Sequence, residues 1–168
     1  MVNEKRTPIE ERLARMFAPR STFRDFRDGT SVATTPRTMT PDVELAAQLG
    51  YIQREHGIDV VMALETHYGS TLIHERHLRR SWDRRCLELD QAGYDDEAAV
   101  LSRWGGAIAI RQFAGATMST AEVNEYAWLI RVRKGTLSYA VWIALGWLEE
   151  LRATGLDALH RAFSVRAA

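Results

Sequence analysis

The chain has 168 residues, 46% of them hydrophobic, and its 22 lysines and arginines balance its 22 aspartates and glutamates. Zero net charge excludes a uniformly basic nucleic-acid-binding protein, so only local clusters can supply such a surface. The single cysteine excludes an intramolecular disulfide and a cysteine-based zinc ribbon, and the length suits one domain, or a compact domain with an arm.

The N-terminal 40 residues predict a helix followed by an arm. In "TPIEERLARMFAP", Thr7 is expected to cap a helix that Pro19 ends. The stretch from 20 to 40 has no sustained period, and it alternates arginines with phenylalanines. Residues 1–40 hold eight basic and five acidic residues, 8 − 5 = +3. We therefore divide the chain into this helix and basic arm (1–40) and a helical domain (41–168).

Two short helices are expected next. Thr40 is the predicted N-cap of a helix through "VELAAQLG", in which Gly50 is either a stop or a packing contact. The stretch "GIDVVMALETHYG" predicts a second helix that Gly69 closes.

The stretch "LIHERHLRRSWDRRCLEL" (72–89) follows after a turn, and on a helix it has two distinct faces. Leu78, Trp82, Cys86 and Leu89 are spaced as one apolar stripe, so Cys86 is expected to pack as a small hydrophobic residue. A second stripe is basic, with further arginines flanking it: Arg76, Arg80 and Arg84, then Arg79 and Arg85.

Three readings of the basic face stay open. It can be a solvated face, with Glu75 pairing with Arg79 and Arg84 with Glu88. It can instead bind nucleic acid or another anionic partner, because residues 71–89 carry five arginines against three acids, 5 − 3 = +2. The third reading is a metal site at His74 and His77, with His67 nearby, but zinc needs three or four ligands.

The rest of the chain also reads as helix. Asp95 or Asp96 is expected to cap a helix in which "RWGGAIAI" places two glycines for close helix packing. "STAE" (119–122) is a capping box, and Gly135 is the expected end of that helix. An apolar helix follows, then Gly155, then a last short helix.

These segments predict an all-α fold, a compact bundle of about seven or eight helices with an N-terminal arm and a helix-turn-helix-like pair. Two pairs are candidates. The pair within 57–85 ends in the arginine-rich helix and suits DNA better. In the pair within 121–148 the second helix is apolar nearly all round, so we expect it to be core. We find no catalytic motif such as GxSxG, HExxH or CxxC, and expect neither an enzyme nor a cofactor.

Three stretches resemble the late-gene antiterminator Q family of lambdoid phages. The first, 40–69, carries the matching residues Asp42, Val43, Ala46, Ala47, Gly50, Gln53 and Gly57. The second, 98–117, is similar to that family's Val-Leu-rich helix, and 125–155 is similar to its closing helices. The best-known member inserts a zinc-binding cysteine cluster between the last two stretches. This chain lacks that cluster, so no zinc role is carried over.

The resemblance implies a transcription antitermination factor that binds late-promoter DNA and bacterial RNA polymerase, so that the elongation complex reads through terminators. The residues expected to contact nucleic acid are Arg76, Arg79, Arg80, Arg84 and Arg85, together with Arg20, Arg24 and Arg27 of the arm. We expect a location in the host cytoplasm and no membrane partner, because the longest apolar stretch is too short to span a bilayer. The alternative is a helical interaction protein, such as a phage inhibitor of a host enzyme, that does not bind DNA.

Overall fold

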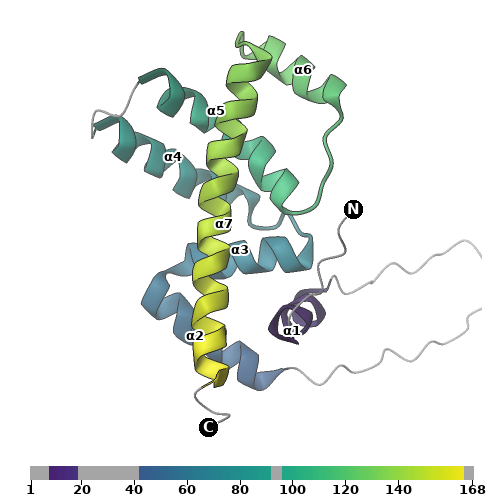
Figure 1. The fold of residues 1–168 in the computed structure, drawn as a ribbon, viewed down its shortest axis with the longest axis vertical. Coiled ribbons are helices and arrows are strands. Elements are labelled where there is room, and N and C mark those ends of the chain that lie inside the picture. Colours follow the sequence, from purple (N-terminus) through teal and green to yellow (C-terminus); the bar gives the residue numbers. More distant parts are fainter. Residues whose placement is uncertain (1–7, 19–41, 92–95, 165–168) are drawn as a thin grey trace, which may run out of the picture.

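The computed structural model describes residues 8–18, 42–91 and 96–164. Over these ranges the chain folds into seven α-helices without a β-strand, which confirms the expected all-α bundle (Figure 1). The helices are α1 (Pro8–Phe17), α2 (Val43–His56), α3 (Ile58–Gly69), α4 (Glu75–Gln91), α5 (Asp96–Phe113), α6 (Thr120–Leu129) and α7 (Lys134–Ser164).

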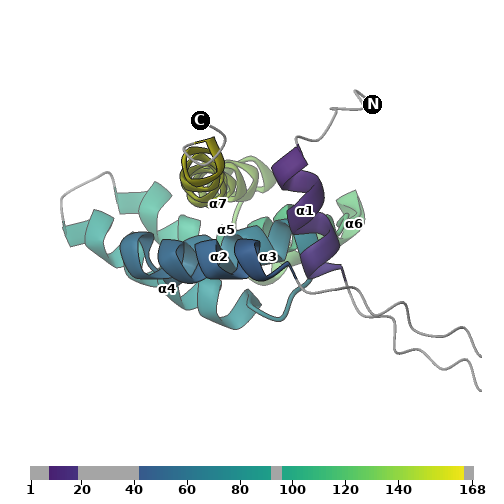
Figure 2. The same cartoon turned by 90° about the horizontal axis from the view of Figure 1, so that it is seen from below.

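Helix α7 is the axis of the molecule. Its 31 residues extend for about 46 Å, and the other helices are arranged around it (Figures 1 and 2). The predicted helix end at Gly135 and the predicted break at Gly155 are both wrong, because α7 passes through both glycines. A Cβ at Gly155 would lie 2.7 Å from Leu64 Cδ1. Close packing on α3 thus accounts for this glycine, which costs a helix only about 1 kcal/mol.

Two apolar clusters form the core, and α3 and α7 contribute to both. The first joins α3–α7 through residues that include Ala63, Leu78, Trp82, Ile108, Phe113, Ala127, Leu137 and Leu148. The second joins α1, α2, α3 and α7 through Ile9, Leu13, Leu45, Leu49, Ile52, Val60, Leu64, Tyr68 and Leu159.

Helix α1 packs against α3 and α7, where a polar cluster secures it. The Tyr68 hydroxyl donates to Glu10 Oε1 at 2.8 Å, and Arg152 donates to the Tyr68 oxygen at 3.3 Å. Burial, with the nearby Glu10 carboxylate, raises the pKa of Tyr68 to about 12. The division of the chain at residue 40 stays a prediction, since residues 19–41 lie outside the described ranges.

The start of α2 differs from the prediction. Asp42, not Thr40, is the N-cap, and its carboxylate accepts a hydrogen bond from the Leu45 backbone N–H at 3.0 Å. Gly50 is neither a stop nor a packing contact, because α2 continues through it and a Cβ there would meet nothing within 4 Å. Thr7, Pro19 and Asp95 lie outside the described residues, so their predicted roles as helix boundaries are not addressed.

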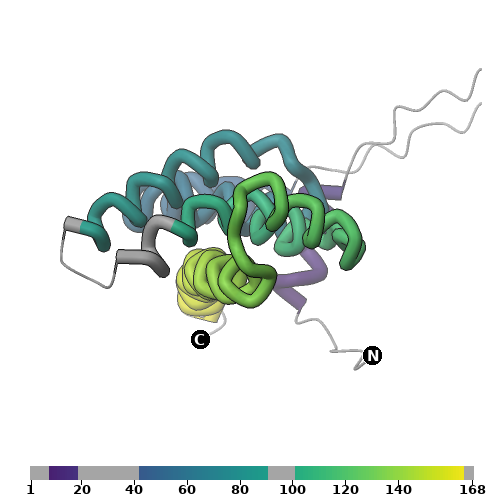
Figure 3. The backbone as a smooth tube through the Cα atoms, turned by 90° about the horizontal axis from the view of Figure 1, so that it is seen from above, coloured from purple at the N-terminus to yellow at the C-terminus, as the bar shows by residue number. Residues whose placement is uncertain are grey.

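Gly105 and Gly106 do mark close packing, as predicted. A Cβ at Gly105 would lie 2.6 Å from the Ala140 carbonyl carbon, where α5 crosses α7, and one at Gly106 would lie 2.5 Å from the Trp82 ring of α4. Figure 3, which looks down on α7, shows α4 and α5 as neighbouring helices beside it. The two glycines therefore allow α4, α5 and α7 to pack closely. This packing determines which face of α4 reaches solvent.

Candidate nucleic-acid interface

Helix α4 buries the apolar stripe that the sequence predicts. Leu78 and Cys86 are fully buried and Trp82 is 2% exposed, while Leu89 is partly buried. The Trp82 indole N–H donates to the Ser102 carbonyl, and Cys86 Sγ lies 2.8 Å from Ser102 Oγ. Burial raises the pKa of the Cys86 thiol, so this cysteine is a packing residue and a poor metal ligand.

The five arginines of α4 are all exposed on the remaining surface. Among the residues that the structure describes, Arg76, Arg79, Arg80 and Arg84 make no hydrogen bond or ion pair. We call these four residues the α4 arginine surface. Their guanidinium groups stay available to an external anion, because no carboxylate in the described ranges pairs with them.

Both predicted ion pairs within α4 are wrong. Glu75 pairs with Arg111 of α5 at 3.4 Å instead of Arg79, and Glu88 pairs with Arg85 at 3.7 Å instead of Arg84. Arg85 and Glu88 are more than half exposed, so their pair adds at most a few tenths of a kcal/mol. One intrahelical pair therefore remains on this face, and Arg79 and Arg84, which were expected to be paired, have no carboxylate partner among the described residues.

A shallow hollow of about 440 Å³ lies at the N-terminal half of α4. Its lining combines exposed aliphatic side chains, arginines and two acids, namely Leu72, Ile73, Arg76, Arg79, Arg80, Glu75 and Asp83. The arginines outnumber the acids, and Glu75 already has Arg111 as its partner. The hollow thus has a positive wall open to solvent.

The histidines do not form a metal site. His74 Nε2 lies 2.7 Å from Glu65 Oε2, and His77 Nε2 lies 2.8 Å from Asp59 Oδ1. His67 is directed elsewhere, with Nδ1 3.2 Å from the Phe113 carbonyl oxygen. In the described part of the chain no three His, Cys, Asp or Glu side chains could hold a metal ion. The His77 contact instead links α4 to α3, where Ser81 adds a hydrogen bond to Asp59, and the His74 contact links the α3–α4 connection to α3.

Helices α3 and α4 are consecutive and are joined by residues 70–74. Ser70 adopts the left-handed conformation with φ 47° and ends α3. Gly69 is the last residue of α3, as predicted, and it also packs closely on α1, since a Cβ there would lie 3.0 Å from the Phe17 carbonyl oxygen. Helix α4, which carries the arginine surface, packs against α3 and, more extensively, against α5. The arm residues Arg20, Arg24 and Arg27 lie outside the described residues, so their contribution stays a prediction.

The other helix pair departs from the prediction. The start of α7 is not all core: Leu137 is buried, but Tyr139 is 52% exposed and Trp142 68% exposed. At the end of α6, Trp128 is 77% exposed. Our sequence reasoning missed these rings because it counted apolar residues without asking which helix covers each face. The helical spacing from Leu137 to Ala144 could have indicated this exposure, because Tyr139 and Trp142 do not lie on the face that these buried residues share.

Comparison with known proteins finds no matching family, no similar curated protein and no similar solved structure. Among the described residues, no helix is long and apolar enough to cross a membrane.

Proposed function

We propose that this protein is a phage-type transcription antitermination factor that binds promoter DNA and RNA polymerase. The observation that carries the DNA-binding part is the α4 arginine surface, with four exposed arginines that have no carboxylate partner among the described residues. The polymerase-binding part rests on the sequence resemblance to the Q family.

The dimensions of the surface fit a duplex. Arg76 and Arg84 are separated by about 12 Å along the helix axis, a distance over which duplex DNA carries about seven phosphate charges. Arginine donates two parallel hydrogen bonds to a phosphate, so each side chain can contact a separate group. Leu72 and Ile73 lie beside them with exposed aliphatic side chains. Contact with sugars and base edges would remove this apolar surface from water.

The first test measures binding of a duplex promoter fragment as salt is varied. Replacing Arg76, Arg80 and Arg84 together by glutamine keeps helix-forming side chains and removes three charges. Because each phosphate contact contributes about −0.9 to the slope of log K against log salt, we expect the triple variant to flatten the slope by about 2–3. Arg54→Gln, an exposed arginine on α2, is the matched control and should leave the slope unchanged.

Equal slopes for the parent protein and the triple variant would remove α4 from the interface. No duplex binding by the parent protein would reject the DNA-binding function.

The second test is a transcription assay with purified host polymerase on a template that carries the late promoter and a strong terminator. Antitermination predicts readthrough that depends on the promoter-proximal DNA and is lost in the triple variant. Polymerase retained on the immobilised protein without readthrough would instead identify a helical inhibitor.

A further inference from the structure

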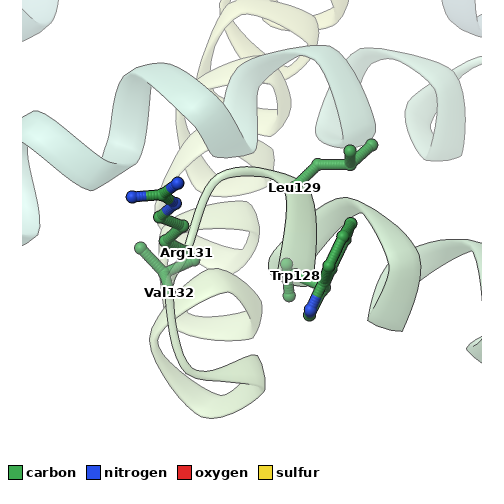
Figure 4. Close-up of a pocket in the computed structure, with 5 residues that line it drawn as sticks. Trp128, Leu129, Arg131 and Val132 are labelled. Atoms are coloured by element: carbon green, nitrogen blue, oxygen red, sulfur yellow. The ribbon is translucent and has the colours of Figure 1, made fainter.

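A second surface surrounds the connection between α6 and α7, and it combines exposed rings with cations. We call it the α6–α7 surface and define it by Trp128, Arg131, Arg133, Lys134, Tyr139 and Trp142. Figure 4 shows Trp128 and Leu129 on the last turn of α6, with Arg131 and Val132 on the connection that leads to α7. These labelled residues line a hollow of about 490 Å³ together with Ala127.

The surface is held by its buried neighbours. Ala127 and Leu137 belong to the first core cluster, against which Ile130 and Val132 also pack. Arg131 adopts φ 57° and reverses the chain between the two helices. With the inward positions filled, the remaining positions face solvent, and Trp128 is 77% exposed. A tryptophan exposed to this degree on a well-anchored turn offers a ring face to a ligand at little conformational cost.

The rings present stacking faces. Tyr139 and Trp142 lie 5.9 Å apart between centroids at an interplanar angle of 24°, so they are stacked on each other. Both stay more than half exposed. Trp128 belongs to the last turn of α6, and Tyr139 and Trp142 belong to the first three turns of α7, so both helices contribute exposed rings.

The chain from the end of α6 into α7 carries cations, with Glu125, one turn before Trp128, and Glu149 as the nearest acids on either side in the sequence. From residue 126 to residue 148 the sequence contains Arg131, Arg133 and Lys134 and not one aspartate or glutamate. All three cations are exposed, and none makes a hydrogen bond or ion pair within the described ranges. The ligand that complements this surface is therefore a polyanion that also carries flat apolar rings.

We propose that the α6–α7 surface binds single-stranded nucleic acid, with bases stacked on Trp128 and Trp142 and phosphates at Arg131, Arg133 and Lys134. A duplex does not fit as well, because its base faces are covered by neighbouring base pairs. A second copy of this chain fits less well, because a two-fold contact centred on this surface would bring two sets of these cations close together. Aromatic platforms flanked by cations are a general means of holding single strands.

This surface is independent of the α4 arginine surface. In Figure 1, α4 lies to the left of α7 and α6 to its right. The residues exposed around the α4 arginines include the aliphatic Leu72 and Ile73, while Trp82 of the same helix is buried. The α4 surface thus offers charge without rings, and the α6–α7 surface offers both.

Fluorescence anisotropy of a labelled thymidine oligonucleotide tests the proposal with the full-length chain. A length of about 12 nucleotides falls within the usual site size. We expect Trp128→Ala and Trp142→Ala each to weaken binding about tenfold, which is the usual effect of removing one stacked ring. Trp128→Phe, which keeps a ring, should restore most of the affinity. Tyr51→Ala, a 50% exposed ring on α2, is the control and should bind as the parent protein does.

The charge part of the proposal is tested with Arg133→Gln combined with Lys134→Gln. This variant should lower the slope of log K against log salt by about 1.4, because single strands contribute about 0.7 per phosphate contact. Circular dichroism of each variant establishes that the fold is retained. No oligonucleotide binding by the parent protein, or unchanged binding by both tryptophan variants, would overturn the proposal.

Two further outcomes keep this inference separate from the proposed function. The triple α4 variant should lose duplex binding and keep oligonucleotide binding, so either surface can fail alone. If instead Trp128→Ala and Trp142→Ala abolish retention of RNA polymerase and leave oligonucleotide binding intact, the surface binds a protein and the single-strand proposal is wrong.

Discussion

Asp42 lies where α1 and α2 meet, and its carboxylate makes two kinds of contact. It caps α2 through the Leu45 N–H at 3.0 Å, and it accepts hydrogen bonds from the Arg12 guanidinium at 2.8 Å. The hydrogen bonds from Arg12 lower the pKa of Asp42 below its ordinary value of 3.8. One side chain thus both begins a helix and connects the N-terminal helix to the remaining core.

We expect Asp42→Ala to lower the free energy of unfolding by about 1–2 kcal/mol, because it removes a helix cap. Asp42→Asn keeps the capping oxygen and removes the charge, so it should cost less. Urea unfolding followed by circular dichroism measures both.

The pH dependence tests the contribution of the carboxylate charge. A lowered carboxyl pKa stabilises the fold above the unfolded value of 3.8 and ceases to do so as pH falls through the folded value. The stability difference between the parent protein and Asp42→Asn should therefore shrink below about pH 4. A difference that stays constant with pH would show that the carboxylate charge contributes nothing to stability.

At the scale of helices, glycines decide how closely α5 and α7 approach. Gly105 faces backbone atoms of α7: a Cβ there would lie 2.6 Å from the Ala140 carbonyl carbon and 2.7 Å from the Val141 nitrogen. Gly146 on α7 is the opposite case, since nothing lies within 4 Å of a Cβ there. The same residue type therefore serves packing at one position and has no packing reason at the other.

We expect Gly105→Ala to destabilise the protein by about 1–3 kcal/mol, because a backbone cannot move aside as a flexible side chain can. Gly146→Ala should stabilise it by about 0.5–1 kcal/mol, through helix propensity alone. Thermal unfolding midpoints of the two variants test this pair. A stabilising Gly105→Ala would mean that α5 and α7 are not in contact at this point.

At the scale of the whole molecule, α3 and α7 connect the two core clusters. Ala63 of α3 belongs to one cluster and Leu64, the next residue, to the other. On α7, Leu148 packs in the first cluster and Leu159 in the second. Two helices shared in this way should make the fold unfold as one cooperative unit.

Trp82 belongs to the first cluster and Trp147 packs against it, while the second cluster contains no tryptophan, so the fluorescence of these two rings reports on the first cluster. We expect Leu159→Ala, in the second cluster, to cost about 2–5 kcal/mol and to shift the fluorescence transition as far as the circular dichroism transition. Leu87→Ala, 47% exposed, should change stability by less than about 0.5 kcal/mol. A fluorescence transition that Leu159→Ala leaves in place would show that the clusters unfold separately.

Features that depend on neighbours along the chain were predictable. The spacing of Leu78, Trp82 and Cys86 identified the buried face of α4 because helical periodicity places them on one side. The capping box of Ser119 and Glu122 was also identified, since both of its hydrogen bonds are local. The glycine pair in "RWGGAIAI" indicated close packing, although it did not identify the partner helices.

Features that depend on contacts between distant segments were decided only by the tertiary structure. By helix propensity, Gly155 is predicted to end the helix. A glycine inside a helix costs only about 1 kcal/mol, and close packing against Leu64 outweighs this cost, so α7 continues. Glu75 takes Arg111 of another helix as its partner, which leaves Arg79 free. Trp142 has a large apolar side chain of the kind that is usually buried. It stays exposed here because α5 and α6 cover other faces of α7. Local sequence sets which residues share a face, and only the assembled helices determine which face is covered.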